Sequence, residues 1–144
     1  MKVVIDTNVL VSALRSRNGA AFRVLQALRE RHFDFALSVP LFLEYEDVLK
    51  RPAMVPLPLM AIEPFLKLLA SRGEPQDIFY LWRPLLRDAK DDMVLELAVA
   101  AGCGVIVTFN QKDFEGIESF NIEALTPYEF LLRLERDVTS KKEK

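Results

Sequence analysis

Acidic side chains in four separated segments of the chain could together perform metal-ion chemistry. Two carboxylates 4 Å apart repel each other by about 4 kcal/mol at an effective dielectric constant of 20, so a cluster of them needs cations or protonation. Hard divalent cations such as Mg²⁺ or Mn²⁺ prefer oxygen ligands of this kind. Two such ions about 3.5 to 4 Å apart can activate water and stabilise both oxygens of an in-line phosphoryl displacement. The candidate residues are Asp6, Glu44, Asp91, Asp92, Asn110 and Asp113.

Each of these residues also has an ordinary structural explanation. An aspartate at the end of a strand, such as Asp6, is often a turn residue. Asp91 and Asp92 could be N-cap or first-turn residues favoured by a helix dipole. Glu44 taken alone fits a solvated helix face. A functional interpretation therefore depends on the fold bringing these residues to one place.

The composition narrows the possible chemistry. The chain has 144 residues, of which 51% are hydrophobic, and this is enough for one domain with its own core. A single histidine, His32, excludes mechanisms that need two imidazoles. The single cysteine, Cys103, cannot form an intramolecular disulfide, which suggests a packed thiol in a reducing cytoplasm. The net charge of -2 provides no global basic field for nucleic acid, so phosphate binding must be local or depend on metal ions.

Short apolar runs predict the strands of a sheet. Residues 1–5 form a β-branched run that ends abruptly in polar residues, as in a strand buried on both faces. Residues 33–39 and 105–108 are similar, and residues 122–125 form a weaker strand. Residues 76–86 are ambiguous, because Ile78, Phe79, Tyr80 and Trp82 favour a strand that Pro75 and Pro84 would limit.

Helical periodicity alternates with these runs. It predicts helices over residues 20–31, 40–49, 56–72 and 127–136, and another that follows the acidic cluster of residues 88–92 and runs to about residue 101. This alternation is typical of an α/β fold with three layers and a central, largely parallel sheet of four to five strands. We expect a single domain over residues 1–137 and a flexible charged tail over residues 138–144. No export signal or membrane-spanning run is apparent, so we expect a cytoplasmic protein.

The predicted fold brings the acidic residues to one edge. In an open parallel sheet, ligands bind in a crevice outside the carboxyl ends of the strands. Asp6 follows the first strand, Asn110 and Asp113 follow the third, and the Asp91 and Asp92 doublet begins a helix. We expect these segments to converge at that edge, and Glu44 joins them if its helix faces the same way.

With these residues identified, the sequence resembles the PIN-domain family of small metal-dependent nucleases. Within that family it is similar to the toxin branch of prokaryotic toxin-antitoxin systems, akin to VapC-type ribonucleases. Each motif is weak alone, but four of them occur in the right order and spacing over nearly the whole chain. The motifs are residues 4–10 with Ser12, residues 44–49 with Arg51-Pro52, residues 87–92, and residues 107–110 with residues 112–114.

The resemblance implies a set of metal ligands. It assigns Mg²⁺ or Mn²⁺ ligation to Asp6, to Glu44, to the Asp91 position and to the group that follows the third strand. The doublet permits either Asp91 or Asp92, and we favour Asp91. Many relatives carry Asp where this chain has Asn110, so we expect Asp113 to supply the missing carboxylate.

Other polar residues near the same edge are candidates for supporting roles. Asn8, Ser12, Thr108 and Asn110 could orient ligands or water, although Ser12 and Thr108 could equally be helix or turn caps. Basic residues near the edge could contact a phosphate backbone, although most such charges only solubilise a protein. The candidates for substrate binding are Arg15, Arg51 and Lys112.

Two functions remain open at this point. The first is an RNA-cleaving toxin held in check by a protein antitoxin and forming a homodimer, as the resemblance implies. The second is a catalytically weak PIN-like module that binds RNA or a protein, which Asn110 and the acidic pI of about 5.5 would favour. An aspartate phosphorylation receiver is discounted, because Pro40 follows the run over residues 33–39 where that class needs an acceptor aspartate.

Overall fold

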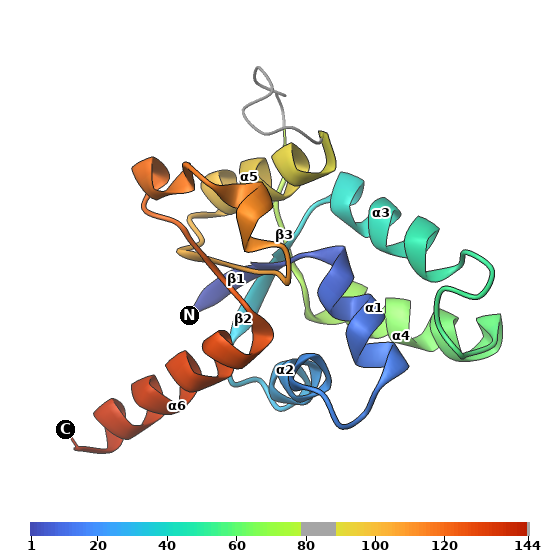
Figure 1. Ribbon diagram of the computed structural model, residues 1–144, viewed down its shortest axis with the longest axis horizontal. Coiled ribbons are helices and arrows are strands. Elements are labelled where there is room, and N and C mark those ends of the chain that lie inside the picture. Colours follow the sequence, from blue (N-terminus) through green and yellow to red (C-terminus); the bar gives the residue numbers. More distant parts are fainter. Residues whose placement is uncertain (79–88, 144) are drawn as a thin grey trace.

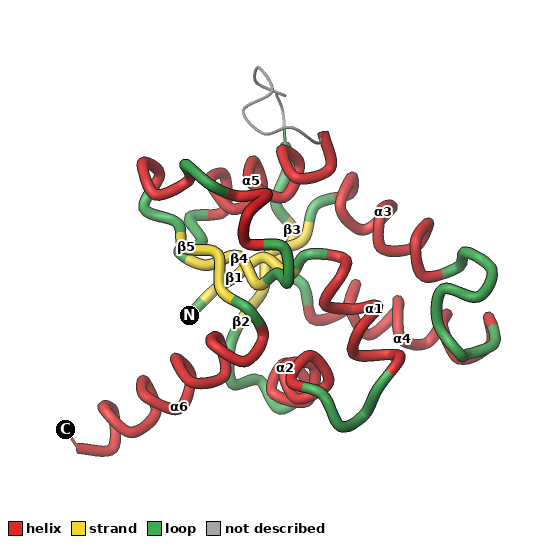
Figure 2. Tube along the Cα trace, viewed as in Figure 1, coloured by secondary structure: helices red, strands yellow, loops and turns green. Residues whose placement is uncertain are grey.

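A five-stranded, all-parallel sheet forms the centre of the molecule in the computed structural model, which describes residues 1–78 and 89–143 (Figures 1 and 2). The strand order is β3-β2-β1-β4-β5, and every neighbouring pair is parallel. The strands are β1 (Lys2–Ile5), β2 (Asp34–Leu37), β3 (Glu74–Pro75), β4 (Val105–Val107) and β5 (Glu123–Leu125). The expected α/β fold with a parallel sheet is therefore confirmed.

The central position of β1 explains its unbroken apolar sequence. Val3, Val4 and Ile5 are fully buried, because helices cover both faces of the sheet. Ile5 pairs with Val107 of β4 on one side, and Val3 pairs with Phe35 of β2 on the other. This register brings the carboxyl ends of β1 and β4 level with each other.

The helices form the outer layers. Helix α5 packs against one face of the sheet, while α1, α2 and α6 pack together on the other (Figure 1). Helix α3 contacts α1, α4 and α5 at the side of the sheet. The bounds are α1 (Thr7–Arg15), α2 (Ala20–Arg29), α3 (Val39–Leu49), α4 (Leu59–Arg72), α5 (Ala89–Ala101) and α6 (Pro127–Glu143). In the part of the chain described, none of these helices is both long and apolar enough to cross a membrane.

The elements differ from expectation in three places. Helix α1 was not predicted, because its β-branched residues follow directly on the strand and hide the helical periodicity. The only strand found near the ambiguous segment is the two-residue β3, which precedes it; Phe79, Tyr80 and Trp82 lie outside the described residues. Helix α6 continues beyond its expected end at Arg136 to Glu143.

The topology creates a crevice between β1 and β4. From β1 the chain passes through α1 and α2 to β2 on one side, whereas β4 lies on the other side and is reached later through α5. The connections at the carboxyl ends of β1 and β4 therefore diverge to opposite faces of the sheet. Ligands of open parallel sheets bind at such a switch point, and Asp6 lies there.

Candidate active site

The carboxylate of Asp6 is held in the crevice by three hydrogen bonds. Its backbone N–H continues the sheet by donating to the Val107 carbonyl at 2.9 Å. One carboxylate oxygen accepts the Thr7 N–H at 2.8 Å, at the start of α1. The other oxygen accepts the Thr108 hydroxyl at 2.8 Å and the Asn8 amide at 3.2 Å. These bonds fix the orientation of the side chain.

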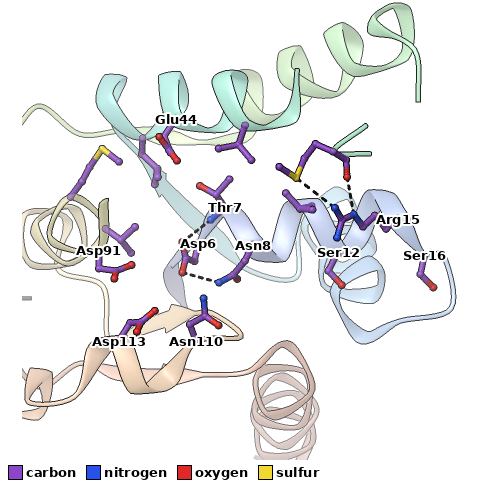
Figure 3. A pocket seen from close by; sticks show the side chains of 16 residues that line it. Asp6, Thr7, Asn8, Ser12, Arg15, Ser16, Glu44, Asp91, Asn110 and Asp113 are labelled. Carbon is purple, nitrogen blue, oxygen red and sulfur yellow. Dashed lines mark hydrogen bonds between the residues drawn. The ribbon is translucent and has the colours of Figure 1, made fainter. Parts of the chain in front are cut away.

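Thr108 and Asn8 also join the tip of β4 to that of β1. The buried Thr108 hydroxyl accepts the backbone N–H of Asn110 at 3.0 Å. The Asn8 side-chain oxygen accepts the backbone N–H of Phe109 at 3.2 Å. Asn8 and Thr108 thus form a hydrogen-bonded network around Asp6, and Figure 3 shows the bonds of Asp6 to Thr7 and Asn8.

The surroundings of Asp6 disfavour its negative charge. Burial raises the pKa of Asp6 above its usual value, and the nearby charges of Asp113 and Glu44 raise it further. The hydrogen bonds from Thr108 and Thr7 oppose this rise but do not cancel it. A bound cation would reverse the balance, because it would stabilise the ionised carboxylate.

A cavity of about 500 Å³ brings together residues from four parts of the sequence. Figure 3 shows the side chains of Glu44, Asp91, Asn110 and Asp113 arranged around that of Asp6. Glu44 comes from the middle of α3, and Asp91 comes from the first turn of α5. Asn110 and Asp113 come from the loop after β4, where residues 111–114 form a short 3-10 helix. Four of the five predicted acidic residues thus line one cavity.

The far end of the cavity has a different character. Ser12, Arg15 and Ser16 lie there (Figure 3). The cavity as a whole also has apolar lining residues, among them Leu41, Val48 and Met54. The Arg15 Nε donates to the Met54 carbonyl at 2.7 Å, which ties α1 to the loop after α3. Met54 carried no signal in the sequence, because only the fold brings its loop beside α1.

Some predicted residues lie outside the cavity lining. Arg51 pairs with Asp47 at 2.8 Å on the exposed side of α3. Lys112 is exposed on the short helix beside Asp113. Asp92, the neighbour of Asp91, is also absent from the lining. The geometry therefore gives Asp91 and Arg15 a place at the cavity and leaves Asp92, Arg51 and Lys112 beside it.

The donor chemistry fits a hard cation. Carboxylate and amide oxygens surround the cavity, and these are the ligands that Mg²⁺ and Mn²⁺ prefer. Within the described residues, no three acidic, histidine or cysteine side chains are grouped closely enough to hold one ion by themselves. The site therefore suits ions that keep several water ligands, as Mg²⁺ commonly does.

Comparison with known proteins agrees with this fold. Residues 2–112 match the sequence pattern described as PIN domain, and the chain belongs to the PIN-domain family. This is a family of nucleases whose members typically bind divalent metal ions. No curated protein sequence matches the chain.

Two toxin-antitoxin complexes are among the solved structures with a similar fold. One is the VapBC2 complex from Rickettsia felis bound to a DNA fragment from its promoter, with a TM-score of 0.60 and 21% identity over 88% of this chain and 98% of the other. The second is FitAB bound to an IR36 DNA fragment, with a TM-score of 0.55 and 18% identity over 88% of this chain and 95% of the other. At these identities the likeness concerns the fold.

Proposed function

We propose that the chain is a metal-dependent endoribonuclease that hydrolyses phosphodiester bonds in RNA and acts as the toxin of a toxin-antitoxin pair. The observation that carries this proposal is the cavity at the switch point, where Asp6, Glu44, Asp91 and Asp113 meet from four separate segments. Such a concentration of carboxylates raises the electrostatic cost of an empty site and favours divalent cations.

Mg²⁺ or Mn²⁺ would be held in the cavity by these four carboxylates and the amide of Asn110, in part through water ligands. When bound, the ion supplies positive charge against the phosphate oxygens and makes water at the site more acidic. The protein's contribution is to orient the ligands, and Asp6 is held in place by Thr108 and Asn8. The rigid placement of Asp6 reduces the entropy lost when the site is assembled.

Arg15 is suited to bind the RNA backbone at the far end of the cavity. Its guanidinium has five N–H donors; the one on Nε is directed to the Met54 carbonyl, and one on Nη2 is directed to the Met54 sulfur at 3.6 Å. This anchor holds the remaining donors near Ser12 and Ser16, at a distance from the acidic end. A phosphate next to the one being cleaved would bind there, away from the carboxylates.

The partner proteins follow from the likeness to VapBC2 and FitAB. We infer that a protein antitoxin suppresses the nuclease and that the chain forms a homodimer in the cytoplasm. An alternative function is a catalytically weak module that binds RNA or a protein. The amide of Asn110 favours this alternative, because it lowers the charge of the site.

A cleavage assay on the purified chain separates these functions. A panel of structured RNAs is incubated with Mn²⁺ and wild-type protein, Asp6→Asn or Asp34→Asn. Asp34 is an exposed carboxylate at the start of β2, away from the cavity, and serves as a matched control. We expect cleavage by the wild type and by Asp34→Asn but not by Asp6→Asn. Equal products from all three proteins would assign the activity to a contaminant, and binding without cleavage would support the alternative.

A further inference from the structure

The side chain of Tyr45 forms a link between the two elements that carry Asp6 and Glu44. Tyr45 is fully buried on α3, and its hydroxyl donates a hydrogen bond to the backbone carbonyl of Ile5 at the end of β1. Glu44 is the residue before Tyr45, and Asp6 is the residue after Ile5. One hydrogen bond thus joins the immediate neighbours of two residues that face the same cavity.

The Ile5 carbonyl lies at the end of β1, beyond the point where β2 supplies backbone N–H donors to it. Because the Asp6 N–H bonds to β4 and successive residues point to opposite sides of a strand, the Ile5 carbonyl points toward β2. The paired residues of β1 and β2 end at Val3 and Phe35, since the chain turns into α3 at Ser38. The Tyr45 hydroxyl supplies a donor at the position where the ladder ends, and a buried carbonyl without a donor is costly.

We propose that Tyr45 is a positioning residue that sets the separation of Asp6 and Glu44 across the metal-binding cavity. This inference rests on the proposed nuclease function of the same site. Asp6 is already fixed on its other side by Thr108 and Asn8, so the Tyr45 bond adds a connection from β1 to α3. Without that hydrogen bond, α3 is held less tightly to β1, and the position of Glu44 relative to Asp6 is less well defined.

The phenol group suits this role. A tyrosine hydroxyl has an ordinary pKa of about 10, so it stays protonated at neutral pH and can donate to the Ile5 carbonyl. Replacement by phenylalanine removes this donor and leaves the ring, so the contribution of the hydroxyl can be separated from that of packing.

The test measures RNA cleavage and the melting temperature at increasing Mn²⁺ concentrations. The proteins compared are the wild type, Tyr45→Phe and Phe130→Leu. Phe130 is fully buried on α6, where it packs edge-to-face on Phe33 away from the cavity, so its replacement controls for a general loss of stability. We expect Tyr45→Phe to need on the order of tenfold more Mn²⁺ for half-maximal cleavage, because small displacements of ligands are costly. Excess Mn²⁺ should restore most of the rate, and Phe130→Leu should keep the wild-type midpoint.

Two further arms distinguish positioning from a structural role. With 4-aminophenylalanine at position 45, an N–H donor replaces the hydroxyl, and the wild-type midpoint should return. The double variant Tyr45→Phe/Glu44→Gln should have the same Mn²⁺ midpoint for cleavage as Glu44→Gln alone. The reason is that the loss of the Tyr45 hydroxyl acts on metal binding through the position of Glu44. If Tyr45→Phe does not fold, Tyr45→Met provides a second side chain without a donor for the same titration.

The outcomes separate this inference from the proposed function. A wild-type midpoint in Tyr45→Phe, with only a lower melting temperature, would show that the hydroxyl supports the fold alone and would overturn the inference. A wild type that neither cleaves RNA nor responds to Mn²⁺ would instead overturn the proposed function, and the inference with it.

Discussion

The two sides of the cavity hold their ligands in different ways. On the β1 side, Asp6 is largely buried and accepts three hydrogen bonds from Thr7, Asn8 and Thr108. On the β4 side, Asn110 and Asp113 are exposed on a short helix after the strand. The β1 side is therefore rigid before any ion binds, whereas the β4 side can adapt.

The loop on the β4 side is anchored through Gln111, the residue that follows Asn110. The Gln111 side chain donates to the Ala124 carbonyl at 2.9 Å and to Glu129 at 2.8 Å. Glu129 in turn accepts the Thr126 N–H at 2.9 Å at the start of α6. The difference between the two sides suggests that Asp6 decides whether an ion binds at all and that the β4 loop adjusts how tightly it is held.

The largest expected effect comes from the rigid side. Asp6→Asn should reduce cleavage by at least about a hundredfold, roughly 2.7 kcal/mol of barrier. Without metal its stability should be unchanged or higher, because burial, Asp113 and Glu44 all disfavour the charge of Asp6. Cleavage rates check the first expectation, and thermal melts of the same samples without metal check the second. An unfolded variant would show that Asp6 is structural, and full cleavage would remove its catalytic role.

A smaller effect is expected from the adaptable side. Asp113→Asn should cost about tenfold in cleavage rate, or 1.4 kcal/mol of barrier. Asn110→Asp should lower the metal concentration for half-maximal activity, because a carboxylate adds charge that an amide lacks. Metal titrations of both variants measure these effects. If neither variant differs from wild type, Asp6, Glu44 and Asp91 hold the ions alone and the β4 side takes no part.

Metal binding should also be visible without substrate. Millimolar Mg²⁺ or Mn²⁺ should raise the melting temperature of the wild type, because a ligand that binds only the folded state stabilises it, by about 2.7 kcal/mol at a hundred times its dissociation constant. The rise should shrink in Glu44→Gln and Asp91→Asn but not in Glu118→Gln, whose carboxylate lies outside the cavity. Equal rises in all four proteins would indicate nonspecific ion binding.

The smallest expected effect concerns Glu129, which anchors the β4 loop by accepting a hydrogen bond from Gln111. Hydrogen bonds from the Thr126 backbone, the Thr126 hydroxyl and Gln111 lower the pKa of Glu129 below its usual value of 4.5. Its contribution to stability is therefore present above pH 4.5 and is lost as the pH falls through the lowered pKa. Glu129→Gln should lower the melting temperature by about 1 to 3 °C at pH 7 and by less at acidic pH. If the melting temperatures of Glu129→Gln and the wild type differ by the same amount at pH 7 and at acidic pH, the ionised Glu129 carboxylate does not anchor the loop.

Much of the fold could be predicted from local sequence patterns. The apolar runs over residues 1–5 and 105–108 predicted the strands that became β1 and β4, because strands buried on both faces require continuous apolar residues. The helices over residues 20–31 and 40–49 were correct to within two residues at each end. Helix α1 was missed, since its first residues have polar and β-branched side chains that also suit a turn.

The sequence by itself determined which acidic residues follow the strands and begin the helices, and therefore which edge of the sheet carries the site. It favoured Asp91 but did not decide between Asp91 and Asp92, because adjacent positions at a helix start have similar local preferences. Only the tertiary structure places Asp91 at the cavity, ties Arg15 to Met54, and joins Tyr45 to Ile5. The physical reason is that these contacts join residues far apart in the chain, and packing of α1, α3 and α5 around the sheet decides which side chains meet.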